Sequence, residues 1–105
     1  MTLLLLGCFT AEPPAAPAWR DHPVVYTHHA RERMDCRQVT EDEVLAVLKD
    51  GVLDPSRTRN DGECPSVALE ATSADGQELR VVFAQCEGEN RVVTAIDLGA
   101  DHGCD

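Results

Sequence analysis

A histidine and two arginines in the first half of the chain have types and spacing that could support chemistry. His29, Arg33 and Arg37 recur at intervals of four residues, which would place their side chains in a row along one face of an α-helix. Two guanidinium groups can hold an anion through charge-assisted hydrogen bonds, and an imidazole can transfer a proton near neutral pH. The row therefore predicts an anion-binding or acid–base site.

The same row can also be interpreted as a solvated basic helix face, offset by the neighbouring Glu32 and Asp35. Charged rows on surface helices are common, and most of them do no chemistry. The helix is predicted over about residues 28–36, and Ala30 and Met34 would form its adjacent apolar face. Both interpretations require other elements to position this helix.

The helix that follows has clear start and stop signals. Thr40 and Glu43 are spaced as a capping box, in which each side chain accepts a hydrogen bond from the other residue's backbone N–H. Acidic residues in the first turn and Lys49 in the last complement the helix dipole, and Gly51 stands where a left-handed C-cap is expected. These signals predict a helix over residues 41–50. Its apolar stripe, which must be buried, consists of Val44, Leu45, Val47 and Leu48.

Composition limits the classes of partner. The chain has 105 residues, with 9 basic and 19 acidic side chains and a net charge of -10, which indicates one acidic domain. Nonspecific binding to nucleic acid is disfavoured, because most of the surface would repel phosphates. A local basic site is the remaining route to a nucleic-acid contact. Its candidate members are Arg33 and Arg37, with Arg57 and Arg59.

The N-terminal residues suggest export. Residues 1–8 read MTLLLLGC and resemble the end of a bacterial lipoprotein signal, in which Cys8 would be lipidated; the alternative is an accidental apolar tail. No Lys or Arg precedes the leucines, as would follow from a start codon assigned too late. Residues 9–19 are predicted to be a Pro/Ala-rich tether, and residues 20–105 a single domain. The expected location is the bacterial cell envelope, with membrane contact through the lipid anchor only.

The second half of the chain predicts a β-hairpin whose register can be derived. With Ala74 to Gly76 as a three-residue loop, Ser73 faces Gln77 and each pair further out matches in character. A two-residue loop would shift the pairing by one and mix apolar with polar positions. The expected pairs are Ala71 with Leu79, Leu69 with Val81, Val67 with Phe83, Glu70 with Arg80, and Cys64 with Cys86.

Two further strands complete the predicted sheet. A turn over residues 87–90 leads into residues 92–98, which would set Thr94 opposite Phe83, Ile96 opposite Val81 and Leu98 opposite Leu79. The run His22 to Tyr26 is an edge-strand candidate because Pro23 cannot donate to a ladder. The predicted fold class is α+β, with a helical hairpin packed on an antiparallel meander sheet of three to four strands.

Four cysteines remain when Cys8 is set aside, and they allow three pairings. The hairpin register favours a Cys64–Cys86 disulfide, which leaves Cys36 to pair with Cys104. Disulfides require an oxidising compartment, in agreement with export. No CxxC pair is present, which makes a structural zinc site the weaker interpretation.

A metal site built from histidines is a further alternative. The chain offers His22, His28, His29 and His102, but adjacent His28 and His29 would point about 100° apart on a helix. Asp101 and Asp105 beside His102 would hold a metal weakly. No metal or cofactor is therefore predicted.

The first helix and the helix after it resemble a known family. The run His29-Ala30-x-x-Arg33-Met34-x-x-Arg37, followed by Val39-Thr40-x-x-Glu43-Val44 and Gly51, is similar to the bacterial domain-of-unknown-function family 4258. The resemblance covers about residues 26–98. Through this family it extends to the fold of the RelE and ParE toxins, which implies a RelE-like fold and an RNA-cleaving or RNA-binding ancestry.

Two functions follow as expectations. In the ribonuclease interpretation His29 is the acid or base, Arg33 and Arg37 clamp the phosphate, and Thr94 is a hydrogen-bonding partner. The favoured interpretation is a noncatalytic domain that binds a protein or an anionic ligand, because the acidic charge, the cysteines and the tether agree with it. There the row would be structural and would fix the helical hairpin on the sheet.

Overall fold

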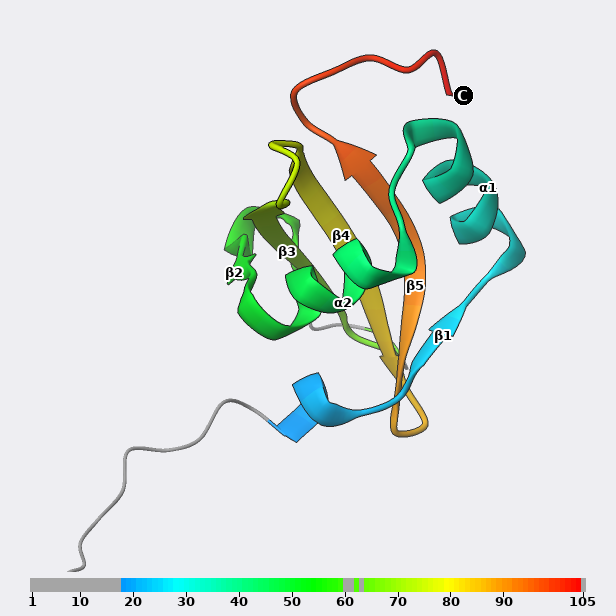
Figure 1. The fold of residues 1–105 in the computed structure, drawn as a ribbon. Helices are drawn as coiled ribbons and strands as arrows, with labels where there is room; N and C mark the ends of the chain where they lie inside the picture. Colours follow the sequence, from blue (N-terminus) through cyan, green and yellow to red (C-terminus); the bar gives the residue numbers. More distant parts are fainter. Residues whose placement is uncertain (1–17, 60–61, 63, 105) are drawn as a thin grey trace, which may run out of the picture.

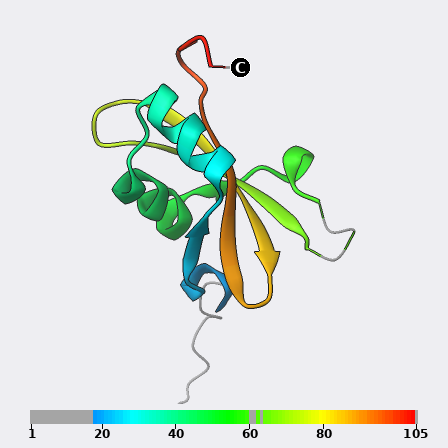
Figure 2. The same ribbon diagram turned by 90° about the vertical axis from the view of Figure 1, so that its right-hand side faces the viewer.

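The computed structural model describes residues 18–59, 62 and 64–104 and has an α+β fold (Figure 1). Helices α1 and α2 cover one face of a mixed sheet in the order β1-β5-β4-β3-β2 (Figure 2). The elements are η2 (Ala18–Asp21), β1 (Val24–Tyr26), α1 (His28–Arg37), α2 (Glu41–Asp50), β2 (Val52–Leu53), η3 (Pro55–Arg57), β3 (Ser66–Thr72), β4 (Glu78–Cys86) and β5 (Glu89–Asp97).

The β3–β4 hairpin has the predicted register. Leu69 pairs with Val81, and Glu70 pairs with Arg80, whose Nε lies 2.9 Å from a Glu70 carboxylate oxygen. Gly76 has a φ of +92°, as a left-handed loop position requires. The matched character of opposing residues was therefore sufficient to align these two strands.

The predicted β4–β5 register is wrong by two positions at Phe83 and by one at Val81. Phe83 pairs with Val92 rather than Thr94, and Val81 pairs with Ala95 rather than Ile96. The strands are joined at Glu87 and Gly88, both at positive φ, and the register shifts at a bulge between Val82 and Phe83. The tight turn and the bulge together change which β5 residues face the helices. Leu98, predicted opposite Leu79, is exposed beyond the strand.

The sheet is larger than the predicted meander. β1 is an edge strand as expected, but it runs parallel to β5, and β2 adds a fifth strand beside β3. A parallel pair needs a long crossover connection, here the whole chain from α1 to β4. Only the α+β class is therefore confirmed, and the purely antiparallel sheet of three to four strands is corrected.

Helix α2 begins and ends at the predicted residues, and its capping box forms, with Glu43 N–H donating to Thr40 Oγ1 at 3.1 Å and Thr40 N–H to Glu43 Oε1 at 2.9 Å. The prediction for Gly51 is wrong, because this residue is extended, with a φ of -68°. A Cβ there would lie 2.4 Å from the Val47 carbonyl oxygen and 3.1 Å from Leu69 Cβ. Glycine is needed for close approach and not for a left-handed backbone.

The core lies between the helices and the sheet. α1 packs against β5, and α2 packs against β3 and β4. Ala30 and Met34 are buried from α1, as the sequence predicts. The other buried apolar residues include Val39, Val44, Val47, Leu48, Leu69, Leu79, Val81, Phe83, Val92 and Ala95.

Both expected disulfides are present. Cys64 is bonded to Cys86 beside the hairpin, and Cys36 at the end of α1 is bonded to Cys104 in the C-terminal tail. The N-terminal leucine run and Cys8 lie outside the described residues. None of the described helices is long and apolar enough to cross a membrane.

Candidate functional site

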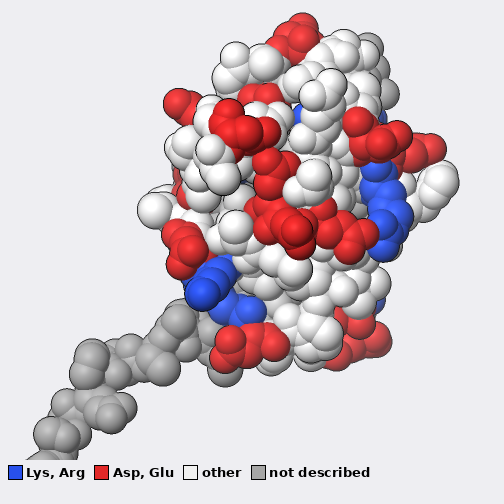
Figure 3. Space-filling model, in the orientation of Figure 1, with Lys and Arg blue, Asp and Glu red and all other residues white. Residues whose placement is uncertain are grey.

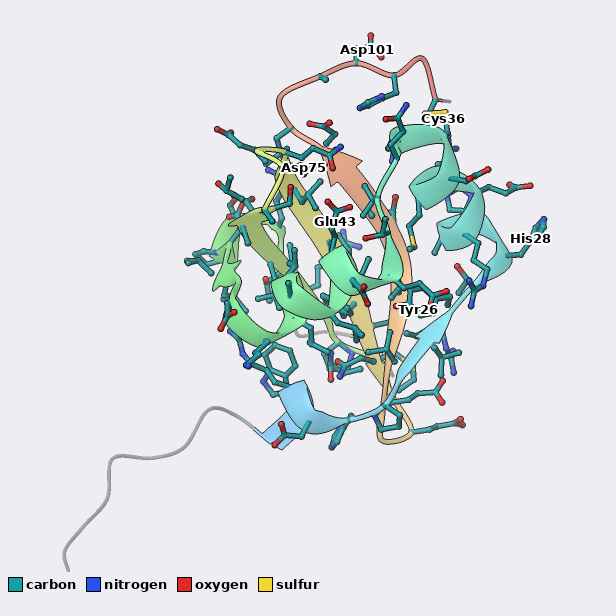
Figure 4. All side chains as sticks on the ribbon, in the orientation of Figure 1. Tyr26, His28, Cys36, Glu43, Asp75 and Asp101 are labelled. Carbon is teal, nitrogen blue, oxygen red and sulfur yellow. A yellow bond between two sulfur atoms is a disulfide. The ribbon has the colours of Figure 1, made fainter. Side chains whose placement is uncertain are left out.

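Two members of the predicted row meet on the surface of α1. His29 is exposed in the first turn and Arg33 is half-buried one turn later. Arg33 Nε donates to His29 Nε2 at 3.3 Å, as four-residue helical spacing allows. His28 points away from the domain (Figure 4) and lies 3.1 Å from Glu32. The surface of α1 therefore presents an imidazole and a guanidinium side by side.

The third member, Arg37, is directed to the sheet and the tail. Its Nη1 donates to the Ala95 carbonyl oxygen at 2.9 Å and to Thr94 Oγ1 at 3.4 Å. Its Nη2 donates to the Cys104 carbonyl oxygen at 3.5 Å. These acceptors occupy both terminal nitrogens of the guanidinium. Arg37 thus binds the end of α1 to β5 and to the tail.

The tail that follows β5 is bonded to the C-terminal end of α1. Besides the Cys36–Cys104 disulfide, His102 Nε2 lies 2.9 Å from Asp97 Oδ2. The hydrogen bond from His102 is the main reason that the pKa of Asp97 is lowered, and the Gly99 N–H adds to the effect. A cleft of about 270 Å³ remains between α1 and the tail, lined by Glu32, Arg33, Cys36, Gly103 and Cys104.

The sequence does not indicate two polar residues, Gln77 and Asp97, that contribute to the junction of α1, β5 and the tail. Gln77 Nε2 donates to the Arg37 carbonyl oxygen at 3.4 Å and to Asp97 Oδ2 at 3.2 Å. The sequence pattern indicates Gln77 only as the residue that faces Ser73 beside the hairpin loop, and Asp97 only as part of a strand. Gln77 lies forty positions after Arg37 in the sequence, and Asp97 lies sixty positions after it. No local sequence pattern indicates that these three residues are in contact.

A larger cleft lies elsewhere, between α2 and the segment formed by η2 and β1. Its volume is about 580 Å³, within the range of about 300–1,000 Å³ that is usual for ligand sites. Its apolar lining includes Val24 and Tyr26 from β1 and Leu45 and Leu48 from α2. Leu45 is 46% exposed. This cleft is called the α2–β1 groove below.

One end of the groove is anionic. Tyr26, labelled in Figure 4, is the last residue of β1 and lines the groove together with Glu41. Its pKa is raised by burial and then by the carboxylates of Glu41 and Asp42. Arg31 partly opposes this effect. Its guanidinium lies 4.7 Å from the centre of the Tyr26 ring and 2.7 Å from Glu41 Oε2.

The opposite end of the groove is lined by the basic residues Arg20 and Lys49, with the carboxylate of Asp21 beside them. Arg20 Nη1 donates to the Leu48 carbonyl oxygen at 2.8 Å and to the Lys49 carbonyl oxygen at 3.4 Å, which caps the last turn of α2. The Arg20 guanidinium also lies 5.1 Å from the centre of the Trp19 ring. Lys49 is exposed and lines the groove. The apolar lining of the groove therefore lies between an end with Glu41 and an end with Arg20 and Lys49.

The surroundings of the groove are acidic. Figure 3 shows acidic side chains gathered in a band across the face that α2 occupies, with smaller basic patches at its sides. Helix α2 contributes Glu41, Asp42, Glu43 and Asp50. The field on this face is therefore mainly negative and would attract cationic partners at long range.

The histidines considered as metal ligands do not form a ligand cluster in the part of the chain that the structure describes. Within residues 18–59, 62 and 64–104, no group of three or more His, Cys, Asp or Glu side chains could hold a metal ion. His28 contacts Glu32, and His102 contacts Asp97. Asp105 lies outside the described residues.

Comparison with known proteins agrees with the resemblance of the helical hairpin. Neither the curated proteins nor the solved structures include a match to this chain. One family model matches residues 26–97, from Tyr26 in the groove to Asp97 under the tail. Because that match spans more than half of the chain, the protein belongs to the family described as Domain of unknown function (DUF4258).

Proposed function

We propose that this protein is a noncatalytic binding domain that holds a segment of another protein in the α2–β1 groove. The observation that carries the proposal is the groove itself, where Leu45 leaves apolar surface open beside Val24 and Tyr26. Exposed apolar surface rimmed by charged groups is typical of protein-binding sites.

The contacts of Arg37 support a noncatalytic role. A phosphate clamp would need the Arg37 guanidinium to be directed to the same side as His29 and Arg33, but it is directed to β5 and the tail, where three of its five N–H groups donate to Ala95, Thr94 and Cys104. It therefore stabilises the junction of α1, β5 and the tail. This is the structural role expected in the binding interpretation.

In this proposal the domain lies in the cell envelope, where a lipid on Cys8 anchors it and residues 9–19 hold it away from the membrane. Two disulfides support an oxidising compartment.

Anchoring can be tested in bacteria that produce the full chain and are grown in the presence of a labelled fatty acid. Label on the wild-type chain and not on a Cys8→Ala variant is expected, and equal labelling or none would refute the lipid anchor.

Binding in the groove can be tested by photo-crosslinking in cells. A photo-crosslinking residue at Leu45 is expected to give a discrete covalent product with one partner protein. The same residue at Val52, which is 74% exposed on β2, serves as the control and is expected to give none. Identical products from both positions, or no product from Leu45, would contradict a partner in this groove.

A ribonuclease or toxin-like activity is the second candidate, favoured by the contact of Arg33 with His29 at 3.3 Å. Here His29 would transfer the proton and the two arginines would bind phosphate. The test is RNA cleavage by the purified oxidised chain and by folded His29→Ala and Arg33→Ala variants. Cleavage that either substitution abolishes would favour this candidate over the binding domain.

A further inference from the structure

The charges of the α2–β1 groove have a fixed order and spacing. Glu41, Leu45 and Lys49 recur at intervals of four residues on α2 and all line the groove. A helix rises about 1.5 Å per residue, so the first and last of these lie about 12 Å apart along its axis. The groove thus presents an acidic end, an apolar middle and a basic end in that order.

Each end is held in place by neighbouring residues. At the acidic end, Arg31 contacts Glu41 and the Tyr26 ring, and Asp42 follows Glu41 in the first turn of α2. At the basic end, Arg20 is bound to the carbonyl oxygens of Leu48 and Lys49. These contacts keep the two ends distinct.

We propose that the α2–β1 groove binds an extended peptide segment in one direction, with a Lys or Arg at the Glu41 end and an Asp or Glu at the Lys49 end. This inference rests on the proposed binding function. An extended chain rises about 3.3 Å per residue, so side chains four positions apart lie about 13 Å apart. Alternate side chains face the same side, which places an apolar residue midway, over Leu45. The matching pattern is basic-x-apolar-x-acidic.

The experiment compares two synthetic peptides of identical composition, one with the order Lys-Ser-Leu-Ser-Glu and one with Glu-Ser-Leu-Ser-Lys, both with blocked ends. Binding to the full oxidised chain is followed by the NMR shifts of the Tyr26, Leu45 and Lys49 amides. The first peptide is expected to bind about fivefold more tightly or better, since reversal replaces two attractive contacts by two repulsive ones.

Variants test the assignment of the ends. Exchanging the charges by Glu41→Lys with Lys49→Glu is expected to reverse the peptide preference. Lys49→Glu alone, which leaves the Arg31–Glu41 contact intact, is expected to weaken the preference. Arg57→Glu makes the same charge change at an exposed residue of η3 and is expected to leave the preference unaltered.

The outcomes separate this inference from the proposed function. Equal affinity for both peptides, or a preference that Arg57→Glu changes as much as Lys49→Glu, would overturn the directional pattern. If Leu45 still crosslinked a partner in cells, the binding function would stand without it. No peptide binding together with no crosslink from Leu45 would overturn both.

Discussion

The Arg37 guanidinium donates a hydrogen bond of 2.9 Å to the carbonyl oxygen of Ala95. This contact joins the last residue of α1 to the buried part of β5, across 58 positions of sequence. The same guanidinium reaches Cys104 in the tail. One side chain therefore connects three segments whose relative placement determines the shape of this end of the domain.

Replacing Arg37 by alanine should lower the free energy of unfolding by about 1.5–3 kcal/mol, the usual contribution of hydrogen bonds to a charged group. Urea denaturation measures the change. Arg33→Ala is the matched control and should change stability by less than about 0.5 kcal/mol, because its partner His29 is exposed. Equal losses in the two variants would contradict the structural role of Arg37.

Removing the Cys36–Cys104 disulfide should cost more stability than removing Cys64–Cys86. The first bond closes a loop of sequence separation 68 and the second one of 22. Loop-closure entropy then predicts about 1 kcal/mol more stabilisation from the longer loop. Denaturation of the two paired Cys→Ala variants tests this, and a larger loss from the Cys64–Cys86 variant would refute it.

Stability should fall in acid partly through Asp97. Because the hydrogen bond from His102 lowers the pKa of Asp97 in the folded state, its contribution is fully present above the unfolded pKa of about 3.9. The contribution is lost as the pH falls through the lower folded pKa. Asp97→Asn should therefore flatten the stability profile in this acidic range, measured by urea denaturation at each pH.

The control for the acid experiment is Asp50→Asn, since Asp50 is exposed at the end of α2. Its profile should follow that of the wild type. An Asp97→Asn profile as steep as the wild-type profile in the same range would show that Asp97 does not contribute.

Gly51→Ala should destabilise the domain by about 1–3 kcal/mol, because the new Cβ would lie 2.4 Å from the Val47 carbonyl oxygen and force α2 away from β3. Gly99→Ala is the matched control, with its nearest contact an ordinary 3.7 Å from Asp97. Thermal denaturation compares the two. Similar melting temperatures for both variants would contradict the close-approach explanation for Gly51.

Local signals predicted the parts of the fold that depend on neighbouring residues. The capping box of Thr40 and Glu43 and the pairing of Glu70 with Arg80 each involve residues within ten positions of each other. The disulfide pairing followed from the hairpin register and elimination. In these cases the types and spacing of a few residues are enough to predict the observed contact.

The parts that sequence reasoning missed depend on distant contacts. The parallel pairing of β1 with β5 joins residues 24–26 to residues 90–92. The β4–β5 register is set by the tight turn at Glu87 and Gly88 and then changes by one position at the bulge between Val82 and Phe83. The four-residue spacing correctly brought His29 to Arg33. It could not show that Arg37 turns to β5, because the acceptor is a backbone carbonyl with no sequence signature.

The most direct test of groove binding uses the partner protein identified by crosslinking at Leu45. The affinity of this partner is measured for three chains: wild type, Leu45→Asp and Val52→Asp. A charge placed against Val24 and Tyr26 should weaken binding about tenfold or more. The same charge at Val52, on the opposite edge strand, should change it less than about twofold. Equal affinities for all three folded chains would contradict the α2–β1 groove as the binding site.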